Sequence, residues 1–368
     1  MLNELHALPE GILDRDTRGL QDLLGGPTLI HLPGDRQPAL FLSVLLHGNE
    51  TVGWEALRGL LQHRLARFGE LRLPRALSIF IGNVAAAAAG VRHLPEQPDY
   101  NRVWPGSELA PTPEHDLMHQ VTAILRTRGL FASLDIHNNT GLNPHYAGVN
   151  RLDHQTLHLA TLFSRTLMYF RRPKGIQAMA MGEFCPAVTL ECGKVGDRHG
   201  LEHARATIDA CLHLAALPRH PVPPHDLDLF HTVARVEVPP ALSFAFPPGQ
   251  GDILFTPDLD RFNFRELPRG TAFGRVTGHY ESYLDARDEQ GRDVYARFFH
   301  VAAGELRLST PVMPSMLTLN EEVIRHYTEK QSTALWHQLR EWVRGVEERV
   351  PEVHLHVEHG YPNTVIER

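Results

Sequence analysis

Four short apolar runs, each followed by a polar residue, limit the fold of this chain more than any other sequence feature. The runs are residues 39–46, 76–81, 131–136 and 186–190. Their length and composition suit buried strands. Stretches with helical spacing lie between and after them, at residues 51–65, 114–128, 153–170 and 201–217. This alternation predicts an α/β domain with a mainly parallel sheet flanked by helices.

Polar side chains follow these predicted strands directly. His47, Asn83, His137 and Glu191 each come at or just after the end of an apolar run. In an open α/β sheet, ligands bind outside the carboxyl ends of the strands. We therefore expect these four residues to lie near one site.

The sequence changes in character near residue 220, where a Pro-rich stretch over residues 220–225 resembles a linker. The short candidate strands beyond it are residues 232–238, 242–246, 252–255, 274–278 and 294–301. Residues 321–348 have helical spacing, and residues 353–357 alternate like an edge strand. We expect one domain over residues 1–220 and a smaller β-rich domain over 221–318. The domain membership of the helix and strand within 319–368 is left open.

His47 and Glu50 stand three residues apart just beyond a predicted strand, and Gly48 between them favours a turn. His137 ends another predicted strand. Two imidazole nitrogens and one carboxylate leave a fourth zinc position open, which is typical of a catalytic zinc site. The pattern predicts one Zn²⁺ per chain, held by His47, Glu50 and His137.

Glu191 ends the fourth predicted strand, where a carboxylate can act as a general base toward water. Asp135 shares a strand face with His137 and either orients it or is simply a buried, hydrogen-bonded carboxylate. A protein without metal fits the same residues, with hydrogen-bonded histidines at strand ends and Glu50 at a helix N-terminus. The combination of positions favours the metal site.

Four separated motifs carry a resemblance to a known family. They are HGNE at 47–50, the stretch from Asn83 through Gly90-Val91-Arg92 to Asp99-Tyr100-Asn101-Arg102, DIHN at 135–138, and TLECGKVG at 189–196. In order and spacing they resemble the succinylglutamate desuccinylase and aspartoacylase branch of the zinc carboxypeptidase superfamily. The resemblance is good over residues 30–215, and family members commonly carry a smaller β domain after the zinc domain.

The resemblance implies a zinc-carboxypeptidase-like catalytic domain in which His47, Glu50 and His137 hold the zinc ion and Glu191 is the base. It further implies that Arg92 polarises the scissile carbonyl and stabilises the oxyanion. Asn101 and Arg102 are implied to hold a carboxylate of the substrate. A planar guanidinium suits both of these tasks.

The function expected from these residues is hydrolysis of an amide bond in a small carboxylate-bearing substrate, such as an N-acyl amino acid. A metallocarboxypeptidase or peptide amidase acting on short peptides is the first alternative, and a catalytically silent zinc-fold binding protein is the second. Residues 138–146 depart from the desuccinylase pattern, so the acyl group stays open. The roles of His145, Tyr146, Lys194 and Arg198 stay open too.

Composition narrows the range of partners. The net charge of -7, without a dense run of Lys or Arg, argues against nucleic-acid binding. No apolar stretch is long enough to span a bilayer, and the N-terminus lacks the pattern of a signal peptide. Three cysteines in a long chain suit a reducing compartment. We expect a cytoplasmic protein with a small-molecule substrate, and the sequence leaves its oligomeric state open, a homo-oligomer included.

Overall fold

The computed structural model describes residues 1–325, which divide into two compact units. Unit 1 contains Met1–Ala234 and takes in two later segments, Asp260–Glu266 and Met313–Leu317. Unit 2 contains Arg235–Leu259, Leu267–Val312 and the described residues from Thr318 onward. The domain division at 220 and 318 stays a prediction. The expected strand over 353–357 and most of the expected helix over 321–348 lie outside the described residues.

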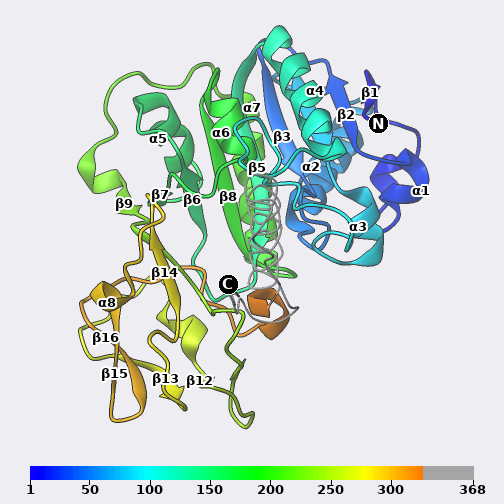
Figure 1. Cartoon of the computed structure of the whole chain (residues 1–368). Coiled ribbons are helices and arrows are strands. Elements are labelled where there is room, and N and C mark those ends of the chain that lie inside the picture. The colour runs from blue at the N-terminus through cyan, green and yellow to red at the C-terminus, as the bar shows by residue number, and fades with distance from the viewer. Residues whose placement is uncertain (326–368) are drawn as a thin grey trace, which may run out of the picture. The chain divides into compact units, whose positions relative to one another are not determined.

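Unit 1 is built on a nine-stranded sheet, shown in Figure 1. In spatial order its strands are β1 (Asn3–Leu5), β2 (Thr28–Leu32), β4 (Leu77–Ile81), β3 (Ala39–Val44), β5 (Leu130–Asn139), β8 (Ala187–Lys194), β6 (Tyr146–Val149), β7 (Thr166–Tyr169) and β9 (Asp228–His231). Neighbouring strands run parallel except at the β2–β4 and β6–β8 pairs. The predicted mainly parallel α/β sheet is confirmed.

The central strands form because their residues are apolar on both faces. Every residue of β3 and of β4 is buried, as the continuous apolar runs predict. The prediction of one helix over 153–170 is wrong, because α5 (His154–Thr161) ends early and β7 follows it. Leu167 and Met168 of β7 are buried between two neighbouring strands, and short apolar runs fit either element.

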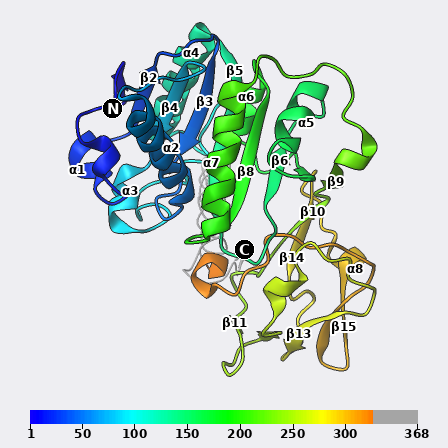
Figure 2. The same cartoon turned by 180° about the vertical axis from the view of Figure 1, so that it is seen from behind.

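The helices of unit 1 cover both faces of this sheet. They are α1 (Leu20–Leu24), α2 (Val52–Phe68), α3 (Val84–Ala89), α4 (Pro113–Arg128), α5, α6 (Gln177–Gly182) and α7 (Arg198–His213). Figure 2 shows α2 and α7 side by side in front of the sheet. Their apolar residues join one core cluster, whereas α4 and α6 contribute to a second one.

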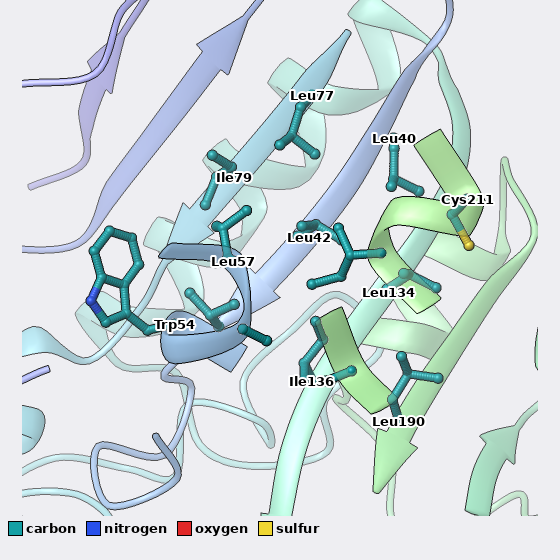
Figure 3. Packing of buried hydrophobic residues seen from close by; sticks show 14 of the residues in the cluster. Leu40, Leu42, Trp54, Leu57, Leu77, Ile79, Leu134, Ile136, Leu190 and Cys211 are labelled. Carbon is teal, nitrogen blue, oxygen red and sulfur yellow. The ribbon is translucent and has the colours of Figure 1, made fainter. Parts of the chain in front are cut away.

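Alternation along each strand divides its side chains between these two cores. Figure 3 shows Leu134 and Ile136 of β5 and Leu190 of β8 on the side of Trp54 and Leu57 from α2. The residues between them therefore face the side of α4 and α6. On this side β5 carries Asp135 and His137, and β8 carries Glu191. The sheet thus presents its polar strand-end residues on one face.

Unit 2 has two small sheets. One pairs β10 (Ala234–Glu237) with β14 (Asp285–Asp288); the other has the order β11 (Phe244–Ala245), β12 (Ile253–Phe255), β13 (Ala272–Val276), β16 (Glu305–Leu308) and β15 (Phe299–Ala302). The prediction of a β-rich region after the α/β sheet is confirmed. The expected strand over 294–301 is partly wrong, because α8 (Tyr295–Phe298) occupies its first half. Among residues 1–325, no helix is both long and apolar enough to cross a membrane.

Candidate active site

The candidate site lies at the carboxyl ends of β3, β5 and β8, three neighbours in the sheet. His47 and Glu50 follow β3 in a turn closed by a hydrogen bond from the Glu50 amide to the His47 carbonyl. Gly48 is required in this turn, because a Cβ there would lie 2.3 Å from the backbone carbon of Ala86. The turn therefore directs both side chains toward β5.

Glu50 joins the two histidines through its two carboxylate oxygens. Oε1 lies 2.8 Å from His47 Nδ1, and Oε2 lies 2.7 Å from His137 Nδ1. All three residues are buried, and their ligand atoms lie within 4.8 Å of one another. The structure therefore brings together the three residues that the sequence predicts as metal ligands.

The second ring nitrogen of each histidine contacts a further carboxylate. His47 Nε2 lies 2.9 Å from Asp99 Oδ1, and His137 Nε2 lies 2.8 Å from Asp135 Oδ2. Ser43 in turn donates a 2.6 Å hydrogen bond to Asp135 Oδ1. Carboxylates in this position fix the orientation of metal-binding histidines. Asp135 is therefore both a buried, hydrogen-bonded carboxylate and a contact of His137, so the structure agrees with both predicted roles.

Asp99 is a site residue that the sequence reasoning missed. It stands in the Asp99-Tyr100-Asn101-Arg102 motif, for which the resemblance implies roles only at Asn101 and Arg102. Its carboxylate contacts His47 and also accepts hydrogen bonds from Nε and Nη2 of Arg92, at 3.2 and 2.9 Å. The sequence signal for Asp99 is its position two residues before Asn101, in a motif that also contains Arg102.

Neighbouring groups of opposite charge offset the free-energy cost of burying the ionisable side chains of this centre. Burial disfavours ionisation of Glu50, but the charges of His47 and His137 outweigh it and hold its pKa below the ordinary value. Burial alone would lower the pKa of His137, yet Asp135 and Glu50 raise it well above the ordinary value. Burial likewise opposes ionisation of Asp99, whose pKa Arg92 and His47 hold well below its usual range. The centre therefore attracts and stabilises positive charge.

The donor set fits a zinc ion. Two imidazole nitrogens and one carboxylate are a known zinc ligand set, and it leaves one position for water or substrate. The ring nitrogens that face Glu50 are the ones available to a cation, since the other two are turned toward Asp99 and Asp135. A positive ion placed there meets the field that the surrounding carboxylates already provide.

Glu191 stands next to His137 in the sheet, because the two residues are register partners on β8 and β5. Its Oε2 atom is buried and has no hydrogen-bond partner. Burial raises the pKa of Glu191 to about 7; His137 and Arg92 oppose this, and Glu50 and Asp135 add to it. A carboxylate with a raised pKa and a free oxygen is suited to accept a proton at neutral pH.

The three residues implied only by the family resemblance also lie at this centre. Arg92 Nη1 donates to Glu50 Oε1 at 3.1 Å. Asn101 donates from Nδ2 to Asp135 Oδ2 at 2.9 Å, and its Oδ1 accepts from the Gln177 amide. Arg102 donates from Nη1 to the carbonyl of Asn101. Both ends of the Asn101 amide are therefore engaged within the protein.

Three of the residues whose roles are open, His145, Lys194 and Arg198, have their contacts elsewhere. His145 Nε2 is 3.2 Å from Asp197 Oδ2, and its Nδ1 is 3.0 Å from His203 Nδ1. Lys194 pairs with Asp260 at 3.3 Å. Arg198, the first residue of α7, is exposed. None of these contacts places His145, Lys194 or Arg198 among the candidate metal ligands.

A mainly parallel sheet with a buried His–Glu–His centre at its carboxyl edge defines the class as an α/β protein with a candidate catalytic metal site. Residues 36–217 match the family model of the succinylglutamate desuccinylase/aspartoacylase catalytic domain. Residues 36–217 therefore form a domain of this family, as the four motifs predict.

Solved structures share the fold at low sequence identity. Succinylglutamate desuccinylase from Chromobacterium violaceum is 18% identical with a TM-score of 0.51, and the match covers 78% of this chain and 89% of that chain. The corresponding enzyme from Vibrio parahaemolyticus is 16% identical with a TM-score of 0.51, over 77% of this chain and 86% of that chain. The comparison with curated proteins found no match. These matches show that the fold is shared.

Proposed function

We propose that this protein is a zinc-dependent hydrolase that removes the acyl group from an N-acyl amino acid. One observation carries the proposal: a buried His47–Glu50–His137 group stands beside Glu191, which is in register with His137 and has a free carboxylate oxygen. A metal site with an adjacent base is the arrangement that hydrolysis of an amide requires.

Family membership supports the choice of reaction. The family of the matched domain is named after a desuccinylase and an aspartoacylase, and both names refer to the removal of an acyl group. The two solved structures with a TM-score of 0.51 are named succinylglutamate desuccinylases. These names favour an amide of a small molecule over a long peptide as the substrate.

Bound zinc would polarise the carbonyl group of the substrate and increase the acidity of water. Glu191 takes the proton from the attacking water, because its free Oε2 and raised pKa make it a base at neutral pH. The same carboxyl group then returns the proton to the departing amine. No covalent bond to the protein is needed.

The cationic side of the site supports a substrate that bears a carboxylate. Arg92 lies at the centre itself and is assigned to the negative charge that develops on the scissile carbonyl. Arg102 is assigned to the carboxylate of the substrate. Asn101 belongs to the same segment, but its bonds to Asp135 and Gln177 make it the group that fixes this segment beside His137.

Metal content and hydrolysis, measured together, test the proposal. We expect about one zinc ion per chain in the wild-type protein and hydrolysis of some members of an N-acyl amino acid panel. His47→Ala is expected to lose both zinc and activity. His63→Ala is the matched control, because His63 is an exposed histidine of α2 and is expected to change neither.

Other outcomes assign the protein differently. A well-folded wild type that stays metal-free after incubation with zinc overturns the proposal. Zinc binding without turnover of any substrate favours a binding protein with the same fold. Hydrolysis of short peptides, with N-acyl amino acids untouched, assigns the protein as a peptidase or peptide amidase.

A further inference from the structure

A second side of the site begins at Tyr146, which is the register partner of Glu191 on β6. His137, Glu191 and Tyr146 thus form one row across three neighbouring strands. Tyr146 is 5% exposed, and its hydroxyl donates to Met316 Sδ at 3.0 Å. A thioether is a weak acceptor and a largely apolar group, so the surface that Met316 and Tyr146 share is mainly apolar.

Two side chains from far along the chain contact Tyr146. The ring centroid of Phe264 lies 5.0 Å from that of Tyr146, and Met316 accepts its hydrogen bond. Phe264 and Met316 both have left-handed backbones, with φ of 55° and 64°. Bulky residues rarely adopt this conformation, and such strain is concentrated at binding and catalytic sites. The fold therefore holds these two side chains against Tyr146 despite the backbone strain at Phe264 and Met316.

Specific hydrogen bonds fix the two strained residues. Asn263 donates to the Leu317 carbonyl and accepts from the Leu317 amide, both at 2.8 Å. The Met316 amide donates to Asn143 Oδ1, in the segment that follows β5. A Cβ on Gly141 would lie 2.0 Å from the Leu317 carbonyl oxygen, so this segment approaches closely. The arrangement around Tyr146 is therefore built, not a loose surface contact.

The charge on this side differs from that around Arg92 and Arg102. Burial raises the pKa of Tyr146 well above its ordinary value, and the charges of Glu191 and Glu50 raise it further. The phenol thus remains a neutral donor. The side chain of Lys194 is 45% exposed and paired with Asp260. An anionic substrate group placed against Tyr146 would meet the carboxylate of Glu191, its register partner on β8.

We propose that Tyr146, Phe264 and Met316, which we call the acyl wall, receive a neutral and apolar acyl group of the substrate. The carboxylate of the amino acid lies on the Arg102 side, and the acyl group lies against two aromatic rings and a thioether. Apolar contact of this kind favours a benzoyl or medium-chain acyl group over a succinyl group. The inference rests on the proposed function for its choice of substrate.

Matched acyl groups on one amino acid provide the first test. We expect kcat/KM to be at least tenfold higher for the N-benzoyl or N-hexanoyl derivative than for the N-succinyl derivative. Met316→Lys places a cation in the acyl wall and is expected to shift this ratio at least tenfold toward succinyl. Leu65→Lys adds the same charge on the exposed face of α2 and is expected to leave the ratio unchanged.

Binding provides a second readout that does not need turnover. Calorimetry in a Glu191→Gln background compares the N-benzoyl and N-succinyl ligands, with and without Met316→Lys. Tighter N-benzoyl binding that Met316→Lys reverses supports the acyl wall, even if the wild type hydrolyses nothing and the hydrolase proposal fails. Three results overturn the inference. They are N-succinyl binding that equals or exceeds N-benzoyl binding before the lysine is introduced, a binding ratio that Met316→Lys does not change, and binding of neither ligand.

Discussion

The two sides of the candidate site are built from opposite kinds of contact. Around Glu50, charged and polar groups are joined by hydrogen bonds of 2.7 to 3.1 Å to His47, His137 and Arg92. Around Tyr146, aromatic and thioether groups make one weak hydrogen bond. Charged networks hold a fixed geometry, whereas apolar surfaces tolerate variation in shape. We therefore assign the proposed reaction to the first side and the proposed choice of acyl group to the second.

The two sides also differ in what a single substitution does. In a buried ion-pair network, removal of one partner leaves an uncompensated charge and costs about 3–5 kcal/mol. On the Tyr146 side, truncation removes area and packing with no stranded charge. We therefore expect substitutions around Glu50 to have larger effects than substitutions around Tyr146.

Glu191→Gln should give the largest change in activity. The substitution keeps the shape of the side chain and removes the base, so we expect kcat to fall by about 10³-fold. Zinc content should stay at the wild-type level, because Glu191 is not among the three ligands. Steady-state kinetics and metal analysis of one preparation check both. Activity within tenfold of the wild type would remove Glu191 from the reaction.

Asp99→Asn should weaken the metal site without removing a ligand. The amide no longer compensates the charge of Arg92 and holds His47 less firmly, so we expect zinc affinity to fall by about 10- to 100-fold. Competition with a chelator measures the affinity. Asp22→Asn, an exposed aspartate in the first turn of α1, is the matched control. Unchanged zinc affinity in Asp99→Asn would limit Asp99 to a structural role.

A change of pH should alter kcat/KM through Glu191 and leave the acyl preference of the Tyr146 side unchanged. Burial raises the pKa of Glu191 to about 7, and a bound cation lowers it, so the acid limb of kcat/KM should lie at or below pH 7. Because the base must be ionised, kcat/KM should fall about tenfold per pH unit below that limb. The pKa of Tyr146 lies far above this range, so acyl preference should not change across it. Activity that increases with acid below pH 7 would contradict the assignment of the base.

Gly141→Ala should give the smallest effect and act on the Tyr146 side. The new Cβ overlaps the Leu317 carbonyl, so the segment with Met316 must shift. We expect a loss of roughly 1–3 kcal/mol in the free energy of unfolding and a several-fold fall in kcat/KM for neutral acyl substrates, with zinc content unchanged.

A second glycine of unit 1 provides the control for that variant. Gly59 lies inside α2, and nothing lies within 4 Å of an added Cβ. Gly59→Ala should therefore raise the free energy of unfolding by about 1 kcal/mol through helix propensity. Thermal denaturation of both variants measures the difference. A Gly141→Ala protein as stable as the wild type would show that the close approach to Leu317 is not needed.

The outline of the fold and the residues of the charged side could be predicted from the sequence. Continuous apolar runs predicted β3, β4, β5 and β8, because full burial on both faces leaves this composition. The carboxyl ends of parallel neighbours share one edge, so His47, Glu50 and His137 were expected together, with Glu191 beside them. Each of these inferences depends on residues close in sequence to a strand end.

Other element boundaries and the contacts of Tyr146 depend on tertiary packing and could not be predicted. Residues 153–170 divide between α5 and β7, and residues 294–301 between α8 and β15, because pairing with distant strands outweighs local periodicity. Met316 reaches Tyr146 across 170 residues. Nothing in the local pattern around Phe264 or Met316 encodes that contact, since long-range packing and backbone strain exist only once the chain has folded.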